Sequence, residues 1–215
     1  MRKVHHVAIG KPKELAFSSK SKMLTGIEKT GVLEAQLTFQ GFVGDGPFNM
    51  KHHGGPDRTV CVFPVEHYAY FEEKFQKKLP KSAFGENLMV SGMLEKDVAI
   101  GDIFQIGEAV IQVTEARNPC STIGKYNHMP ELYKEVQQTG FTGYLCRTIK
   151  EGKIQQLDEV ILLEADAHQV TVAYCHEMVL HKKGAKADFE RIAAVKALSE
   201  RYYESLQKKL QNSNR

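Results

Sequence analysis

The sequence predicts a mainly β protein, a β-barrel with a few peripheral helices over residues 1–165, followed by a small three-helix unit over residues 166–215. Two observations lead to this prediction. Up to about residue 165, short apolar runs are separated by Gly, Asn and Asp, a pattern typical of barrels and sandwiches. Beyond that point, apolar residues recur at helical spacing. We place the boundary between the two parts where the periodicity changes.

Four segments predict strands most directly. Val4–Ile9 is a plausible opening strand, and Gly31–Phe42 alternates polar and apolar residues, as a half-buried strand does. Val98–Ala116 contains two β-rich runs separated by Gly107-Glu108, which predicts a hairpin. Asp158–Leu163, rich in Val, Ile and Leu, predicts a last strand.

Helical spacing predicts two helices within the barrel region and three in the tail. The first begins at Pro64, because proline is tolerated in a first turn, and the second spans Met129–Thr139. In the tail, Gly184 closes one helix, Asp188 caps the next and Ser199 caps the third. The tail is therefore expected to be a compact helical unit.

Composition and charge exclude several classes of protein. The chain has 215 residues, 42% hydrophobic and 26% charged, which is typical of a globular protein with a sizeable core. No run approaches the ~20 apolar residues of a membrane span, and the N-terminal segment lacks the features of a signal peptide. We therefore expect a cytoplasmic protein with no membrane partner. A net charge of +3 and the lack of an interleaved aromatic and basic stripe argue against a nucleic-acid partner.

The four cysteines differ in local context. They are far apart and form no C-x-x-C pair, which argues against a disulfide framework or a thiolate zinc site, so we expect reduced thiols. Cys61, Cys146 and Cys175 lie in apolar patterns that favour a packing role. Cys120 is different, because it follows the predicted hairpin.

Cys120 is the candidate catalytic and metal-binding residue. Pro119 disfavours further strand pairing, so the strand should stop there and present the thiol at a barrel rim. The guanidinium of Arg117 favours the thiolate, the form that binds metals or attacks. A soft thiolate selects soft or higher-valent metals over magnesium or calcium. The alternative is that Cys120 is a small buried hydrophobe.

A glycine-dense, cationic loop is the candidate anion-binding site. Glycines let the backbone approach a ligand closely, and successive N–H groups can form an anion-binding nest. Cationic side chains add donors that suit a phosphate or pyrophosphate. The loop residues are Lys51, His52, His53, Gly54, Gly55 and Arg58.

Two alternatives to this interpretation of the loop remain open. The loop can be no more than a tight hairpin turn with solvated side chains. A zinc site that joins Cys120 to His52 or His53 is the other. It is disfavoured because neighbouring residues of an extended chain point to opposite sides.

Five segments in this order resemble the MOSC family, named for the C-terminal domain of molybdenum cofactor sulfurases. The similarity spans nearly the whole chain and is strongest to stand-alone bacterial members that carry a three-helix tail. The matching segments are Gly44-Asp45-Gly46, Lys51-His52-His53-Gly54-Gly55-Pro56-Asp57-Arg58, Ala83-Phe84-Gly85-Glu86-Asn87-Leu88, Ile100-Gly101-Asp102 and Arg117-Asn118-Pro119-Cys120.

The resemblance implies a MOSC-type β-barrel that binds a molybdenum cofactor built on molybdopterin. Cys120 would coordinate molybdenum or carry sulfur. The loop up to Arg58 would hold the anionic end of the cofactor, with Arg117 as a further contact. Asn87 would hydrogen-bond the pterin, or else simply end a loop.

The resemblance also implies an activity. Related stand-alone members are associated with the reduction of N-hydroxylated bases, a detoxification reaction on a small-molecule substrate. The sequence has no G-x-G-x-x-G after a strand and no cysteine spacing suited to an iron–sulfur cluster, so we expect a separate electron-donor protein. The alternative is a non-redox carrier or binding module for the cofactor or for sulfur.

Overall fold

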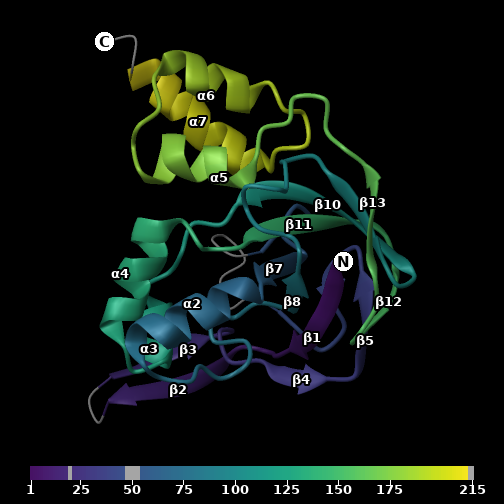
Figure 1. Cartoon of the computed structure of the whole chain (residues 1–215), viewed down its shortest axis with the longest axis vertical. Coiled ribbons are helices and arrows are strands. Elements are labelled where there is room, and N and C mark those ends of the chain that lie inside the picture. The colour runs from purple at the N-terminus through teal and green to yellow at the C-terminus, as the bar shows by residue number, and fades with distance from the viewer. Residues whose placement is uncertain (19–20, 47–53, 213–215) are drawn as a thin grey trace.

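The computed structural model describes residues 1–18, 21–46 and 54–212. It shows a sheet-rich protein with six α-helices among these residues, so the prediction of a protein dominated by strands is confirmed in outline. Figure 1 shows the strands at the centre and right, the helices that follow residue 170 at the top, and the remaining helices at the lower left.

Eight strands form the main sheet, in the order β13-β9-β10-β11-β7-β8-β1-β4. Neighbouring strands pair antiparallel except β7 and β8, which run parallel. A parallel pair needs a crossover connection, and the chain between these two strands contains a helix. The strands are β1 (Lys3–Ile9), β4 (Thr30–Val32), β7 (Val60–Pro64), β8 (Leu88–Ser91), β9 (Ile103–Ile106), β10 (Ala109–Ala116), β11 (Tyr144–Lys150) and β13 (Val160–Glu164).

The strand pairings of the described residues do not close this sheet into a barrel. β13 and β4 stand at its two ends, and an isolated bridge between Lys3 and Glu159 joins β1 to the segment before β13. The predicted closed barrel is therefore not confirmed. A second sheet in the order β12-β5-β6 lies beside the first, and β2 and β3 form a hairpin of their own. Their bounds are β12 (Gly152–Gln155), β5 (Glu34–Thr38), β6 (Gly41–Phe42), β2 (Lys13–Ser18) and β3 (Ser21–Thr25).

The single strand expected over Gly31–Phe42 is divided among β4, β5 and β6. The division comes from partner choice, because β4 pairs with β1 whereas β5 pairs with β12. Leu33 lies between the two strands and is 80% exposed, although alternation placed it inward. By contrast, the hairpin predicted around Gly107-Glu108 is confirmed as β9 and β10.

Three helices pack against one another beside the main sheet: α2 (Glu66–Phe75), α3 (Thr122–Tyr126) and α4 (Pro130–Thr139). α4 matches the predicted helix, with proline in its first turn. α2 begins after Pro64, which is instead the last residue of β7. The buried side chains of these helices form a separate core with Phe63, Phe84 and Met89 of the sheet side.

The predicted three-helix tail is not confirmed. The tail contains α5 (Val172–Cys175), a π-helical turn η1 (His176–Leu180), α6 (Lys186–Ala193) and α7 (Glu200–Asn212). The first expected helix is thus a single α-helical turn that continues as a π turn. Asp188 is the third residue of α6 and accepts from the N–H of Ala185 at 2.8 Å, so the cap position belongs to Ala185. Ser199 does cap α7, accepting from the N–H of Tyr202 at 3.1 Å.

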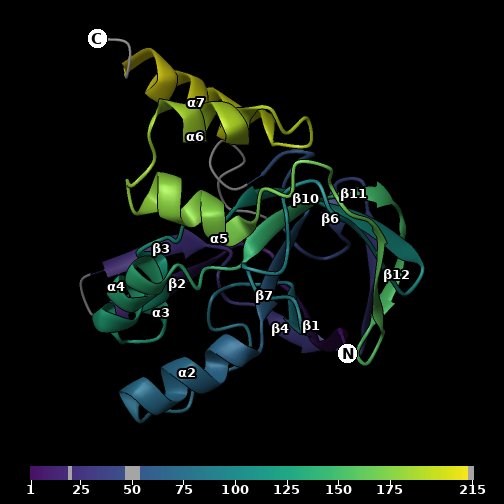
Figure 2. The same cartoon turned by 45° about the horizontal axis from the view of Figure 1, so that its top comes forward.

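The tail and the sheet share one hydrophobic core. Phe104 and Ile111 of the sheet belong to the same buried cluster as Val172, Phe189 and Leu206 of the tail. Figure 2 shows the tail helices lying over one end of β10. The boundary at residue 165 stays a prediction. Every helix in the described part of the chain is too short or too polar to span a bilayer.

Candidate functional site

Cys120 lies in the short connection between β10 and α3. The last backbone contact of the strand is the hydrogen bond from the N–H of Arg117 to the carbonyl of Gly143, at 3.3 Å. The chain then leaves the sheet, and Pro119 is buried while Cys120 is half-buried. The Sγ atom of Cys120 lies 3.1 Å from the hydroxyl of Thr122, at the start of α3. The thiol is thus held by a local turn at the end of a rigid strand.

Arg117 has a buried donor that no described residue accepts. Its Nη2 donates to the carbonyl of Phe84 at 2.5 Å. Its Nη1 is buried and has no hydrogen-bond partner among the described residues. Most buried donors in proteins are satisfied, and an unsatisfied one costs about 1–3 kcal/mol. A guanidinium N–H in this state is suited to an anionic ligand, because it forms its strongest hydrogen bonds with phosphate or carboxylate oxygens.

Glu86 holds in place the turn at Phe84, to which Arg117 donates a hydrogen bond. The hydroxyl of Tyr68 donates to Glu86 Oε1, and Glu86 Oε2 accepts from the N–H of Phe84 at 3.2 Å. Burial raises the pKa of Glu86, and the hydrogen bond from Tyr68 acts in the opposite direction. Because the carbonyl of the same Phe84 receives Arg117, the Tyr68–Glu86 pair fixes the position of the guanidinium.

Asn87 joins three parts of the fold with a fully used side chain. Its Nδ2 donates to the carbonyl of Ala8 on β1 at 3.2 Å and to Asp45 Oδ2 at 2.9 Å. Its Oδ1 accepts from the N–H of Cys61 on β7 at 3.1 Å. The structure therefore gives Asn87 a positioning role, whereas the sequence predicted either a hydrogen bond to the pterin or the end of a loop. Direct contact with a pterin stays a prediction.

Lys29 and Asp45 form a buried ion pair beside Asn87. Their side chains are 6% and 12% exposed, and Asp45 also accepts from the N–H of Gly10 at 2.8 Å. Sequence reasoning missed Lys29, because a single lysine in an irregular segment carries no local pattern. It likewise treated Cys61 only as a packing residue.

The thiol of Cys61 lies among these charged groups. Burial raises its pKa, and Arg117 and Lys29 counteract that effect, whereas Glu86 and Asp45 add to it. The four charged groups are close enough to affect the thiol, so we describe the five residues as one polar cluster: Cys61, Arg117, Glu86, Lys29 and Asp45. Residues from four distant parts of the sequence thus meet near one end of β7.

The Asp57-Arg58 pair anchors the predicted loop to the sheet and the tail. Arg58 Nη2 lies 2.8 Å from Glu115 Oε2 on β10, and the hydroxyl of Ser199 donates to the same carboxylate. Asp57 pairs with Arg147 on β11 at 2.9 Å. The structure therefore places Arg58 in an internal ion pair, while its contact with a cofactor stays a prediction.

The structure describes the two glycines and Arg58 of the loop, but not its other cationic residues. Gly55 has φ of +111°, and among the described residues a Cβ built there would meet nothing within 4 Å, so this part of the chain leaves its surroundings open. The N–H of Arg58 donates to the carbonyl of Gly55 at 3.1 Å, which closes a turn over the Gly54–Arg58 segment. Lys51, His52 and His53 lie outside the described residues. The zinc alternative that uses His52 or His53 is untested for the same reason.

Comparison with known proteins gives a consistent picture. A family model described as the MOSC domain matches residues 49–161. The chain belongs to the MOSC-domain family. The protein YflK of Bacillus subtilis, described as uncharacterized, is 39% identical over 202 residues, covering 94% of this chain and 91% of the relative.

Two further comparisons bear on this MOSC protein. The crystal structure of YiiM from Geobacillus stearothermophilus superposes with a TM-score of 0.83 at 30% identity and covers 98% of this chain and 100% of that one. A protein from Gibberella moniliformis named "Reductase" is 33% identical over 116 residues, which is 52% of this chain and 21% of that protein. MOSC domains are associated with molybdenum cofactor.

Proposed function

We propose that this protein binds molybdenum cofactor through Cys120 and reduces N-hydroxylated bases with electrons from a separate protein. The proposal rests on the presence, in one turn, of a half-buried thiol at Cys120 and a buried guanidinium donor at Arg117 that has no partner in the described part of the chain. The two residues flank one short turn after β10. Family membership and the relative named "Reductase" support the same interpretation.

The residues of the site fit the two ends of such a cofactor. A thiolate is a suitable ligand for a soft or higher-valent metal, and Cys120 is partly accessible. Arg117 Nη1 is available for an anionic oxygen, and the open surroundings of Gly55 leave room for a ligand near the backbone. The donor set therefore suits a metal held by sulfur and an anion held by nitrogen.

When bound, the cofactor supplies a two-electron reduction in which an N–OH group and two protons become an N–H group and water. The residues of the chain bind and orient. Cys120 holds the metal, and Arg117 holds an anionic oxygen of the cofactor. Tyr68 and Glu86 keep Phe84 in place, and with it the guanidinium of Arg117.

Bound molybdenum is the first test. Protein purified from molybdenum-replete cells is expected to contain the metal, and Cys120→Ala is expected to lose most of it. Cys175→Ala is the matched control, because Cys175 is fully buried in the core of the tail and should retain the metal. Wild-type protein without molybdenum, or Cys120→Ala with an unchanged content, would contradict the proposal.

Turnover is the second test. Reduction of an N-hydroxylated purine is measured with a reduced viologen dye as the electron donor, so that no particular partner protein is required. We expect activity in wild type and in Cys175→Ala, and none in Cys120→Ala. Bound molybdenum without turnover would instead favour the non-redox carrier.

A further inference from the structure

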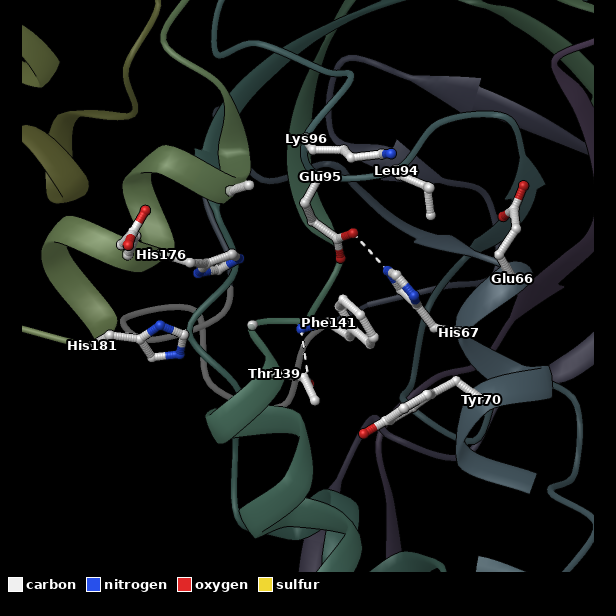
Figure 3. Close-up of a pocket in the computed structure, with 13 residues that line it drawn as sticks. Glu66, His67, Tyr70, Leu94, Glu95, Lys96, Thr139, Phe141, His176 and His181 are labelled. Carbon is white, nitrogen blue, oxygen red and sulfur yellow. Dashed lines mark hydrogen bonds and ion pairs between the residues drawn. The ribbon is translucent and has the colours of Figure 1, made fainter. Parts of the chain in front are cut away.

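A cavity of about 560 Å³ lies away from the candidate site, between α2, the end of α4 and the start of the tail. Figure 3 shows His67 and Tyr70 of α2 on one side of this cavity, His176 and His181 on the other, and Phe141 between them. None of the described residues that were predicted to bind the cofactor lines it. Its remaining lining residues are Glu66, Leu94, Glu95, Lys96, Thr139, Gly140, Ala173 and Glu177.

The π turn of η1 aligns the two histidines on the tail side. In an α-helix, residues five apart lie about 140° apart around the axis and face different ways. Here the N–H of His181 donates to the carbonyl of His176 at 2.9 Å, which closes an i→i+5 turn. This wider turn brings both imidazoles to the same side, toward the cavity (Figure 3). Such turns occur frequently at functional sites.

Hydrogen bonds fix the imidazole rings of His67 and His181 so that each can present an acceptor nitrogen. His67 Nε2 lies 2.6 Å from Glu95 Oε2, and His181 Nε2 lies 2.8 Å from the carbonyl of Gln137. A ring nitrogen facing a carboxylate or a carbonyl must be the N–H, so the Nδ1 of a neutral ring is the acceptor. The ring of Phe141 stacks on His67 with centroids 4.0 Å apart and planes at 7°, so His67 covers one face of Phe141 and holds its ring in place. The ring of Phe141 lies between His67 and His176 (Figure 3).

The charge of the cavity is unfavourable to anions. Among its described lining residues, Glu95 is buried, Glu66 and Glu177 are exposed, and Lys96 is the one lysine. Burial lowers the pKa of His176 to about 4, so this imidazole is neutral at physiological pH and does not repel a cation. Lys183, which is not a lining residue, pairs with Glu177 at 2.9 Å, so three carboxylates face two ammonium groups. The remaining excess of one carboxylate favours a positively charged ligand.

We propose that this cavity is a second binding site, which takes a small planar nitrogen base with a positive charge, an amidinium or a guanidinium. The face of Phe141 that His67 leaves uncovered suits a flat, delocalised cation, and the lining carboxylates of Glu66 and Glu177 accept its N–H groups. Glu95 also accepts from the N–H of Gly143 at 2.8 Å, which fixes its carboxylate in the wall of the cavity.

Packed aromatic rings separate this cavity from Cys120. Phe63 contacts His67 at 5.7 Å between ring centroids and stacks on Phe84 at 4.1 Å, and the carbonyl of Phe84 holds Arg117. The second site therefore does not depend on the proposed cofactor chemistry. Binding to it can be measured on protein that has no metal.

The test uses benzamidine, a planar amidinium, with neutral benzamide and anionic benzoate as probes of matched shape. Binding to the full chain is followed by calorimetry and by ligand-observed NMR. We expect benzamidine to bind and the other two to bind at least about fivefold more weakly, as the loss of one ionic contact of about 1 kcal/mol requires. Equal binding of benzoate, or no binding of benzamidine, would overturn the proposal.

Single substitutions test whether benzamidine binds in this cavity. Glu66→Gln and Glu177→Gln should each weaken benzamidine binding about threefold to fivefold, and Ala173→Phe, which fills the cavity, should abolish it. Glu190→Gln, which removes an exposed carboxylate of α6 outside the cavity, should leave binding unchanged. Cys120→Ala should also bind normally. Loss of benzamidine binding in Cys120→Ala would move the probe to the thiol site and overturn the proposal, whatever the molybdenum content of wild type.

Discussion

The ion pair between Glu115 and Arg58 gives the sharpest prediction about how the loop is held. The two side chains are 5% and 10% exposed, and Arg58 donates to Glu115 Oε2 through both Nε, at 3.1 Å, and Nη2, at 2.8 Å. Ser199 donates to the same oxygen, so this carboxylate joins the loop to β10 and to the start of α7. Glu115→Ala removes all three interactions at once.

The expected loss of stability follows from burial. Removing one partner of a buried ion pair costs about 3–5 kcal/mol, because the remaining charge loses its partner in a poorly solvated setting. We expect about 3 kcal/mol for Glu115→Ala, the lower end of that range, since Arg58 keeps some contact with solvent. The control is Glu34→Ala, which removes an ion pair to Lys153 whose side chains are 51% and 47% exposed. An exposed pair contributes at most about 1 kcal/mol.

Urea unfolding followed by circular dichroism measures both variants. With a slope of about 2–3 kcal/mol per molar urea, Glu115→Ala should lower the midpoint by about 1 M, and Glu34→Ala by a small fraction of that. The double variant Arg58→Ala with Glu115→Ala should lose less than the sum of the two single losses, because the pair is coupled. If Glu115→Ala were no less stable than Glu34→Ala, the ion pair would not anchor the loop.

Three further predictions concern stability. Burial lowers the pKa of His176 from 6.5 to about 4, so the unfolded chain binds the proton more tightly than the folded chain does. The free energy of unfolding should therefore be unaffected by this residue above pH 6.5 and should fall by about 3 kcal/mol as the pH drops to 4. His176→Gln should flatten that part of a stability–pH curve measured by urea unfolding. Asn87→Asp would place a second carboxylate 2.9 Å from Asp45 Oδ2. We expect the free energy of unfolding to fall by about 3 kcal/mol at pH 7, and by less as the pH drops to values at which carboxylates become protonated. A loss of stability that does not change with pH would contradict this. Gly143→Ala should destabilise the fold by more than about 2 kcal/mol and lower the melting temperature accordingly. The reason is that φ is +71° and the new Cβ would lie 2.2 Å from the carbonyl oxygen of Val62. A melting temperature like that of wild type would show that the backbone relaxes freely there.

Local patterns predicted the elements that depend on local interactions. The β9–β10 hairpin was predicted from two apolar runs around Gly107, whose φ of +56° suits glycine. α4 was predicted from its proline and its apolar spacing, and the cap of α7 from Ser199. In each case the residues that determine the element are neighbours in sequence.

The sequence failed where the partner of a segment determined its structure. Residues 31–42 show one continuous alternation but contribute to two sheets, because different strands lie beside each half. The π turn at His176 also has no local pattern that distinguishes it from an ordinary helix.

By itself, the sequence determined that this is a sheet-rich MOSC protein, and it singled out Cys120 and Arg117 within a few residues of one strand end. Only the tertiary structure showed that Arg117 has a buried unsatisfied donor, that Asn87 is used internally, and that Lys29 and Cys61 belong to the same cluster. The physical reason is the range of the interactions. Hydrophobic periodicity and turn geometry act between neighbours, whereas burial and charge pairing depend on which distant segments the fold brings together.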